Sequence, residues 1–110
     1  MKHARLVFGV LTGLCLVTVI FHLVAIAESS GDAPRHALFA ALNVALAAAL
    51  WARPRWLVWP LGALVVQQLW SHGHDLASAC ARGEIDWVSI GVLVVMPLML
   101  VLVWHDRRLT

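Results

Sequence analysis

A run of 22 residues, from position 6 to position 27, contains no formally charged side chain. A helix needs about 20 mostly apolar residues to cross the hydrocarbon core of a bilayer. The run is long enough for that, and it exceeds the apolar region of about 7–15 residues that is typical of a signal peptide. We therefore expect residues 6–27 to form a retained transmembrane helix.

Three further apolar segments carry helix signals at their ends. Asp32 and Asp86 are predicted N-caps, because an aspartate that precedes a helix accepts hydrogen bonds from its first free N–H groups. Pro54 is expected to open the third helix and Gly73 to close it. The four spans are thus predicted at about 6–27, 33–52, 55–72 and 87–104. Residues 76–82, before Gly83, predict a short helix on the outer surface.

The composition supports a membrane protein. The chain of 110 residues is 62% hydrophobic and 13% charged, whereas soluble domains average about 45–50% and about 25%. The net charge of +2 is too small to indicate a nucleic-acid partner, so the expected partner is the lipid bilayer. We predict an all-α fold in which residues 1–110 form a single domain, a four-helix transmembrane bundle.

The basic residues predict how the bundle is oriented. Six of the eight lie at the N-terminus, between the second and third spans, or at the C-terminus: Lys2, Arg5, Arg53, Arg55, Arg107 and Arg108. Arg35 and Arg82 lie on the other side, at the opposite ends of the spans. Because cytoplasmic loops are enriched in Lys and Arg, both termini are predicted to be cytoplasmic. The alanine- and arginine-rich composition favours a bacterial source, and hence the bacterial inner membrane.

Small residues on the first two spans predict close helix contacts. Gly9 and Gly13 form a G-x-x-x-G motif, and a stripe of alanines on the second span has four-residue spacing: Ala37, Ala41, Ala45 and Ala49. In a bilayer, small residues let helix backbones approach one another. These seams are expected to pack the bundle itself; the alternative is that they join a homo-oligomer or a larger membrane complex.

Polar side chains occur at similar depths near the predicted outer ends of three spans. His22, His36 and His72 belong to the first, second and third spans. Asn43 lies seven residues after His36, and Gln68 lies four residues before His72, so each shares a helix face with its histidine. Since unpaired polar groups are costly in hydrocarbon, we expect these five side chains to line one pocket that is open to the outside.

Three interpretations of this pocket remain open. In the first, the pocket is a hydrogen-bonded cluster that fixes the helix register. In the second, it is a metal or haem site, because neutral imidazole is a common metal ligand. In the third, it is a cavity for a quinone, lipid or small solute. In the metal interpretation, His22, His36 and His72 bind zinc, copper or iron, with Glu28 or Asp75 as a further ligand. In the haem interpretation, His22 and His72 are the axial ligands. Asn43 and Gln68 would orient the imidazoles.

The sequence favours a binding role over a catalytic one. No Ser-His-Asp set, glycine-rich phosphate loop or H-E-x-x-H motif is recognisable. The leading hypothesis is a small membrane protein, a binding or redox-accessory protein, whose outer histidine pocket holds a metal ion or haem. One alternative is a cofactor-free structural or accessory subunit of a larger membrane complex. The other is a carrier or enzyme for a lipophilic small molecule.

Overall fold

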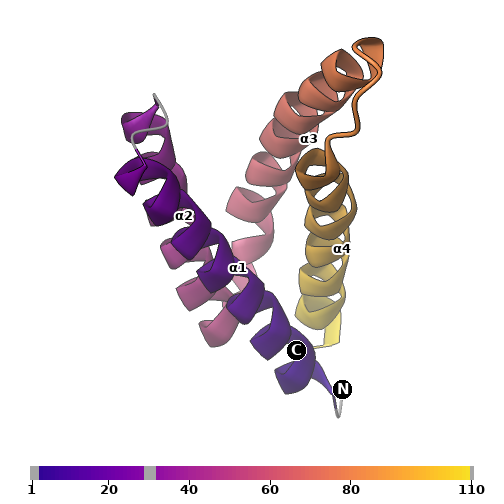
Figure 1. The fold of residues 1–110 in the computed structure, drawn as a ribbon. Helices are drawn as coiled ribbons and strands as arrows, with labels where there is room; N and C mark the ends of the chain where they lie inside the picture. Colours follow the sequence, from indigo (N-terminus) through magenta and orange to yellow (C-terminus); the bar gives the residue numbers. More distant parts are fainter. Residues whose placement is uncertain (1–2, 29–31, 110) are drawn as a thin grey trace. The chain divides into compact units, whose positions relative to one another are not determined.

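The chain forms two helical hairpins. The structure, a computed structural model, describes residues 3–28 and 32–109, with side chains described as far as residue 106. Its elements are α1 (Ala4–Ala27), α2 (Ala33–Ala52), the 3₁₀ turn η1 (Arg55–Leu57), α3 (Val58–Ala81) and α4 (Trp87–Leu109). The chain divides into two compact units, residues 1–54 and 55–110. In the first unit α1 packs against α2, and in the second α3 packs against α4 (Figure 1). The all-α prediction is confirmed.

The helices have the length and the surface of membrane spans. Three of them are long and apolar enough to cross a bilayer: α1, α2 and the part Trp87–Asp106 of α4. Large apolar side chains are exposed along these helices, and all six tryptophan side chains are exposed as well. Tryptophan is enriched where membrane helices meet the headgroup region. The chain is therefore a multi-pass helical membrane protein whose surroundings are lipid.

The helices α2 and α4 begin at Ala33 and Trp87, where the sequence predicts their starts. At α4, the backbone N–H of Ser89 donates to Asp86 Oδ1 at 3.0 Å, which is the bond expected of an N-cap aspartate. At α2 the predicted side-chain cap is wrong: Asp32 makes no side-chain cap hydrogen bond, and its carbonyl oxygen accepts from the His36 N–H at 3.1 Å. Pro34 in this first turn is the remaining start signal of α2.

The third helix differs from the prediction at both ends. The 3₁₀ turn η1 precedes α3, and Pro60 therefore lies in the first helical turn, where its missing N–H forfeits no helical hydrogen bond. At the other end α3 continues through Gly73 to Ala81, so residues 76–81 are its last turns and form no separate outer-surface helix. A glycine inside a helix costs only about 1 kcal/mol, and the alanines that follow favour continued helix.

The actual stop signal of α3 is Gly83. Its φ of 72° lies in the left-handed region that favours glycine. The N–H of Gly83 donates to the carbonyl oxygen of Cys80 at 3.0 Å, and the N–H of Glu84 donates to that of Ala79 at 2.9 Å. This pair of bonds is the Schellman motif. A helix of 24 residues is about 36 Å long, which exceeds the hydrocarbon thickness of about 30 Å.

Within the described residues of the first unit, the two glycines and three of the four alanines of these motifs do not lie at a close helix contact. A Cβ atom added at Gly9 or Gly13 would meet nothing within 4 Å there. The alanines at positions 37, 41 and 45 are exposed. The buried residues of the first unit are instead other small residues and larger ones in equal number: Ala4, Cys15, Ala40 and Ala47, and Phe8, Leu11, Leu46 and Leu50. An oligomer seam at these motifs stays a prediction.

Three of the charges behind the predicted orientation fall outside this description. Lys2 lies outside the described residues, and so do the side chains of Arg107 and Arg108. Arg5, Arg53 and Arg55 are described, and they lie at the start of α1 and next to the connection between α2 and η1.

Candidate functional site

Two imidazoles meet at one end of the N-terminal hairpin. His22 lies five residues before the end of α1, and His36 lies in the first turn of α2. The short connection between the helices therefore brings them to the same end. The Nδ1 atoms of His22 and His36 are 2.8 Å apart, which is a hydrogen-bond distance. Their ring centroids are 5.1 Å apart, and both side chains are half-buried.

The short Nδ1 to Nδ1 distance requires one shared proton. A neutral imidazole carries one N–H and one lone pair. One of the two rings must therefore carry its proton on Nδ1 and donate it to the bare Nδ1 of the other. The two neutral histidines are thus opposite tautomers, and the pair holds one proton between α1 and α2.

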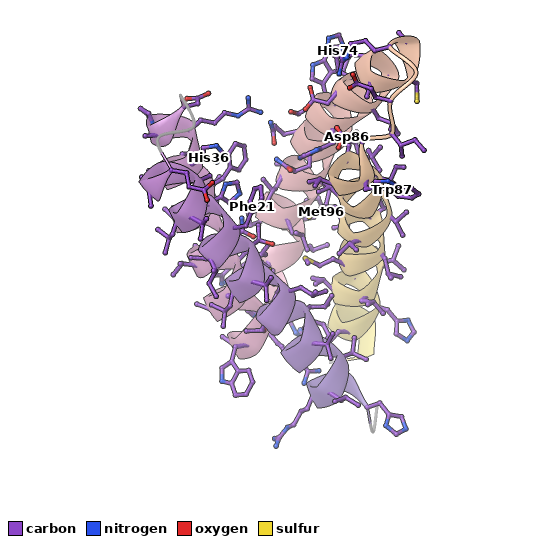
Figure 2. All side chains as sticks on the ribbon, in the orientation of Figure 1. Phe21, His36, His74, Asp86, Trp87 and Met96 are labelled. Atoms are coloured by element: carbon purple, nitrogen blue, oxygen red, sulfur yellow. The ribbon has the colours of Figure 1, made fainter. Side chains whose placement is uncertain are left out.

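Aromatic side chains surround the histidine pair. The His22 ring stacks on the Phe39 ring with a centroid distance of 5.8 Å and an interplanar angle of 20°. Phe21 presents its edge to His22 at 5.5 Å, and the guanidinium carbon of Arg35 lies 5.8 Å from the centre of Phe39. Figure 2 labels Phe21 and His36 on this hairpin. These contacts hold the imidazoles in a largely apolar setting.

His72 takes part in a second cluster, on the C-terminal hairpin. Its Nδ1 atom lies 2.9 Å from Ser89 Oγ. The Ser89 hydroxyl in turn donates to Asp86 Oδ2 at 2.7 Å. Ser89 is only 1% exposed, so the hydroxyl is enclosed between its two partners. The cluster joins α3 to the N-terminus of α4, where Figure 2 labels Asp86.

Asp86 is held in its charged form. Hydrogen bonds from the Ser89 hydroxyl, and then from the Ser89 N–H, lower the pKa of the Asp86 carboxyl below its ordinary value, and the charge of His72 acts in the same direction. A negative charge at a helix N-terminus is also favoured by the helix dipole. The carboxylate therefore accepts protons in hydrogen bonds and donates none.

The two amide side chains that are predicted to orient the imidazoles donate to residues of their own helices. The Asn43 Nδ2 atom donates to the Phe39 carbonyl oxygen, one turn earlier on α2, at 2.9 Å. Gln68 is buried, and its Nε2 atom donates to Gln67 Oε1 at 2.6 Å. Neither bond reaches a histidine. The predicted role of Asn43 and Gln68 in orienting imidazoles therefore has no contact to support it among the described side chains.

The structure thus brings some of the predicted residues together and leaves others apart. His22 and His36 meet, as predicted. His72 belongs to the other unit, and its place in one pocket with them stays a prediction. The proposed additional ligands Glu28 and Asp75 are both exposed. Within the described residues there is no group of three or more His, Cys, Asp and Glu side chains that could hold a metal ion.

Sequence reasoning missed Ser89 and Phe39. The Asp86-x-x-Ser89 spacing is a signal for the cap, because a residue three positions after an N-cap faces back toward it. It does not reveal that His72, 17 residues earlier, reaches the same hydroxyl. Ser89, His72 and Asp86 are the residue types of a catalytic triad, but here the serine lies between the other two. In a triad the histidine lies between serine and aspartate.

Comparisons with known proteins add no family to this description: no family model matches the chain, and neither does any curated protein or solved structure. The fold defines only a class, the multi-pass helical membrane proteins. Because one fold hosts many functions, the function has to be argued from the two polar clusters.

Proposed function

We propose that this chain is a small integral membrane protein that binds a transition-metal ion through His22 and His36. The observation that carries the proposal is the 2.8 Å distance between their Nδ1 atoms, on two different helices. A tetrahedral metal ion with metal–nitrogen bonds of about 2.0–2.1 Å holds its nitrogens about 3.3 Å apart. A movement of about half an ångström would thus let a metal ion replace the shared proton.

The surroundings of the pair suit such an ion. At least one ring of the hydrogen-bonded pair is neutral, because its Nδ1 accepts from the other ring, and neutral imidazole is the form that binds zinc, copper and iron. Phe39 stacks on the His22 ring and Phe21 presents its edge to it, and a hydrophobic shell tunes the redox potential of a bound metal. Two imidazoles leave coordination positions for other ligands, as a binding or redox-accessory protein requires.

Metal titration of the purified full-length protein tests this proposal. With Cu²⁺ or Zn²⁺ as the probe, we expect wild type to bind about one ion per chain more than the His22→Ala/His36→Ala double variant by elemental analysis. For Cu²⁺ we also expect nitrogen coupling in the electron paramagnetic resonance spectrum. His22→Ala and His36→Ala should each weaken binding by more than about 100-fold, because losing even a supporting partner of a ligand costs about 10–100-fold. The matched control is His105→Ala, an exposed histidine on α4.

Two results would contradict the metal site. One is a wild-type protein that binds neither ion. The other is that the His22→Ala/His36→Ala double variant and the His105→Ala control both bind the ions as tightly as wild type does. In the second case the ions bind elsewhere on the chain.

One observation favours a second candidate, the cofactor-free structural or accessory subunit. Within residues 3–28 and 32–106, every buried side-chain nitrogen or oxygen atom has a hydrogen-bond partner. The histidine pair then serves as an interhelical hydrogen bond, of the kind that fixes helix register in membranes. Stability measurements on the paired histidines, described in the Discussion, separate this role from metal binding. The carrier or enzyme for a lipophilic molecule stays a prediction from the sequence.

We also propose that the chain crosses a bacterial inner membrane four times, with both termini in the cytoplasm. The support is α3 as a fourth span, since its 24 residues are long enough to cross the hydrocarbon core, together with Arg5, Arg53 and Arg55 on the predicted inner side. The last turns of α3 and the histidine pair then lie on the outer side, within reach of periplasmic ligands.

The natural cysteines offer a direct test of this topology. Cys80 is exposed near the end of α3, whereas Cys15 is buried in the middle of α1. In a Cys15→Ala background, a membrane-impermeant maleimide should label Cys80 from the outside of spheroplasts. The matched reporter is His3→Cys in a Cys15→Ala/Cys80→Ala background, which should be labelled only after the membrane is permeabilised. The opposite labelling pattern would reverse the proposed orientation.

A further inference from the structure

The hydrogen bonds around His72 fix which of its nitrogens carries the proton. A serine hydroxyl has one proton to donate. The Ser89 proton is directed to Asp86 Oδ2, so Ser89 Oγ can only accept from His72. His72 therefore carries its proton on Nδ1. In the neutral ring this leaves the lone pair on Nε2, the nitrogen that faces away from Ser89.

This arrangement matches the environment of histidines that bind metals. A metal-bound histidine almost always donates its other ring N–H to a carboxylate, a carbonyl oxygen or a water, which sets the tautomer and the ring orientation. At His72 the acceptor is a hydroxyl that is itself hydrogen-bonded to the Asp86 carboxylate. The negative charge behind Ser89 polarises the hydroxyl and makes Nε2 a better electron donor.

We propose that Nε2 of His72 is a ligand position for a transition-metal centre, and that Ser89 and Asp86 are positioning residues that prepare it. The position lies in the C-terminal hairpin and does not depend on the His22–His36 pair. A single imidazole is sufficient for haem iron, which many proteins hold by one histidine while the porphyrin supplies the other nitrogens. A free ion uses the same Nε2 lone pair but needs further ligands.

The binding test uses the full-length protein with His22→Ala and His36→Ala, so that the first site is absent. Haemin and Cu²⁺ are the two probes, followed by the shift of the haem Soret band and by electron paramagnetic resonance. Haemin binding identifies a haem-type centre, and Cu²⁺ binding without haemin binding identifies a free-ion site. In either case His72→Ala should abolish binding. The control His74→Ala, an exposed histidine two residues further along α3, should leave it unchanged.

The positioning role has its own readout. Nitrogen-15 NMR of the imidazoles should show His72 with its proton on Nδ1. Ser89→Ala should shift it toward the Nε2–H form and weaken binding of the probe by about 10–100-fold, whereas Ser89→Thr keeps the hydroxyl and should restore both. Asp86→Asn can still cap α4 through its amide oxygen, but its NH₂ group cannot accept the Ser89 proton. The Ser89 hydroxyl is then free to donate to His72, so this variant should also shift the tautomer toward the Nε2–H form and weaken binding.

Three outcomes would overturn the proposal. The first is that neither haemin nor Cu²⁺ binds the double-alanine protein. The second is that His72→Ala binds the probes as tightly as its parent. The third is that the His72 tautomer is the same in Ser89→Ala as in the parent. None of these results bears on metal binding by His22 and His36, which the wild-type titration tests separately.

Discussion

Replacing His36 by leucine is expected to destabilise the protein by about 0.5–1.5 kcal/mol, the net contribution of a typical hydrogen bond, because the His22 ring that loses its partner is only half-buried. The group left behind is the Nδ1 atom of His22, which lies among Phe21 and Phe39 in the native hairpin. The double variant His22→Leu/His36→Leu leaves no unpaired polar group, so it should be close to wild type in stability. The coupling between the two positions is expected at about 0.6–1.7 kcal/mol, the range found for hydrogen bonds between membrane helices.

A double-mutant cycle on the full-length protein, unfolded in mixed detergent micelles, measures this coupling. The control cycle pairs His36→Leu with His105→Leu, an exposed residue of the other unit, and it should be additive. If the His22 and His36 variants are also additive, the two rings do not share a hydrogen bond in the membrane. Zn²⁺ then separates the two candidate functions. If the pair binds a metal, Zn²⁺ should stabilise the wild-type protein but not the double variant. If the pair is only structural, Zn²⁺ should stabilise neither protein.

The parts of the fold that sequence reasoning predicted are those with local causes. A charge-free run of sufficient length predicts α1, the cap of Asp86 predicts the start of α4, and Pro34 lies in the first turn of α2. The end of α3 was placed at Gly73 because glycine is the commonest residue just after a helix. The structure uses Gly83 instead, where φ is positive. A sequence shows that a glycine is present; it does not show whether the backbone needs a left-handed conformation there.

The candidate sites divide in the same way. His22 and His36 meet because each lies near the helix ends that one short connection joins, so their depth is readable from the sequence. The contact between His72 and Ser89 depends on how α3 and α4 slide and rotate against each other, which side-chain packing decides. Asn43 was expected to reach across helices. Its amide bonds to its own helix instead, since a backbone carbonyl one turn earlier is always within reach.

Removing the Ser89 hydroxyl is the second substitution with a large expected effect. Ser89→Ala takes one hydrogen-bond partner from His72 and one from Asp86. The site is 1% exposed, so water does not replace the hydroxyl. We expect a loss of about 1–3 kcal/mol in the free energy of unfolding. Ser89→Thr should lose less because it keeps the hydroxyl, and Ser71→Ala, at a half-buried serine of α3, is the matched control.

The Ser89 hydroxyl also makes the free energy of unfolding depend on pH, through the Asp86 carboxyl to which it donates. The bonds from Ser89 lower the pKa of Asp86 in the folded protein, so the folded state holds the proton less tightly than the unfolded state. The resulting stabilisation is fully present above the ordinary aspartate pKa of about 3.9 and is lost as the pH falls through the lowered folded pKa. Ser89→Ala removes the hydroxyl bond and keeps the backbone N–H bonds of residues 88 and 89, so its loss of stability between about pH 5 and about pH 2 should be smaller than in wild type. Asp86→Asn should lack this component altogether. Parallel acid curves for the wild-type, Ser89→Ala and Asp86→Asn proteins would mean that Ser89 does not bond the carboxylate in the membrane.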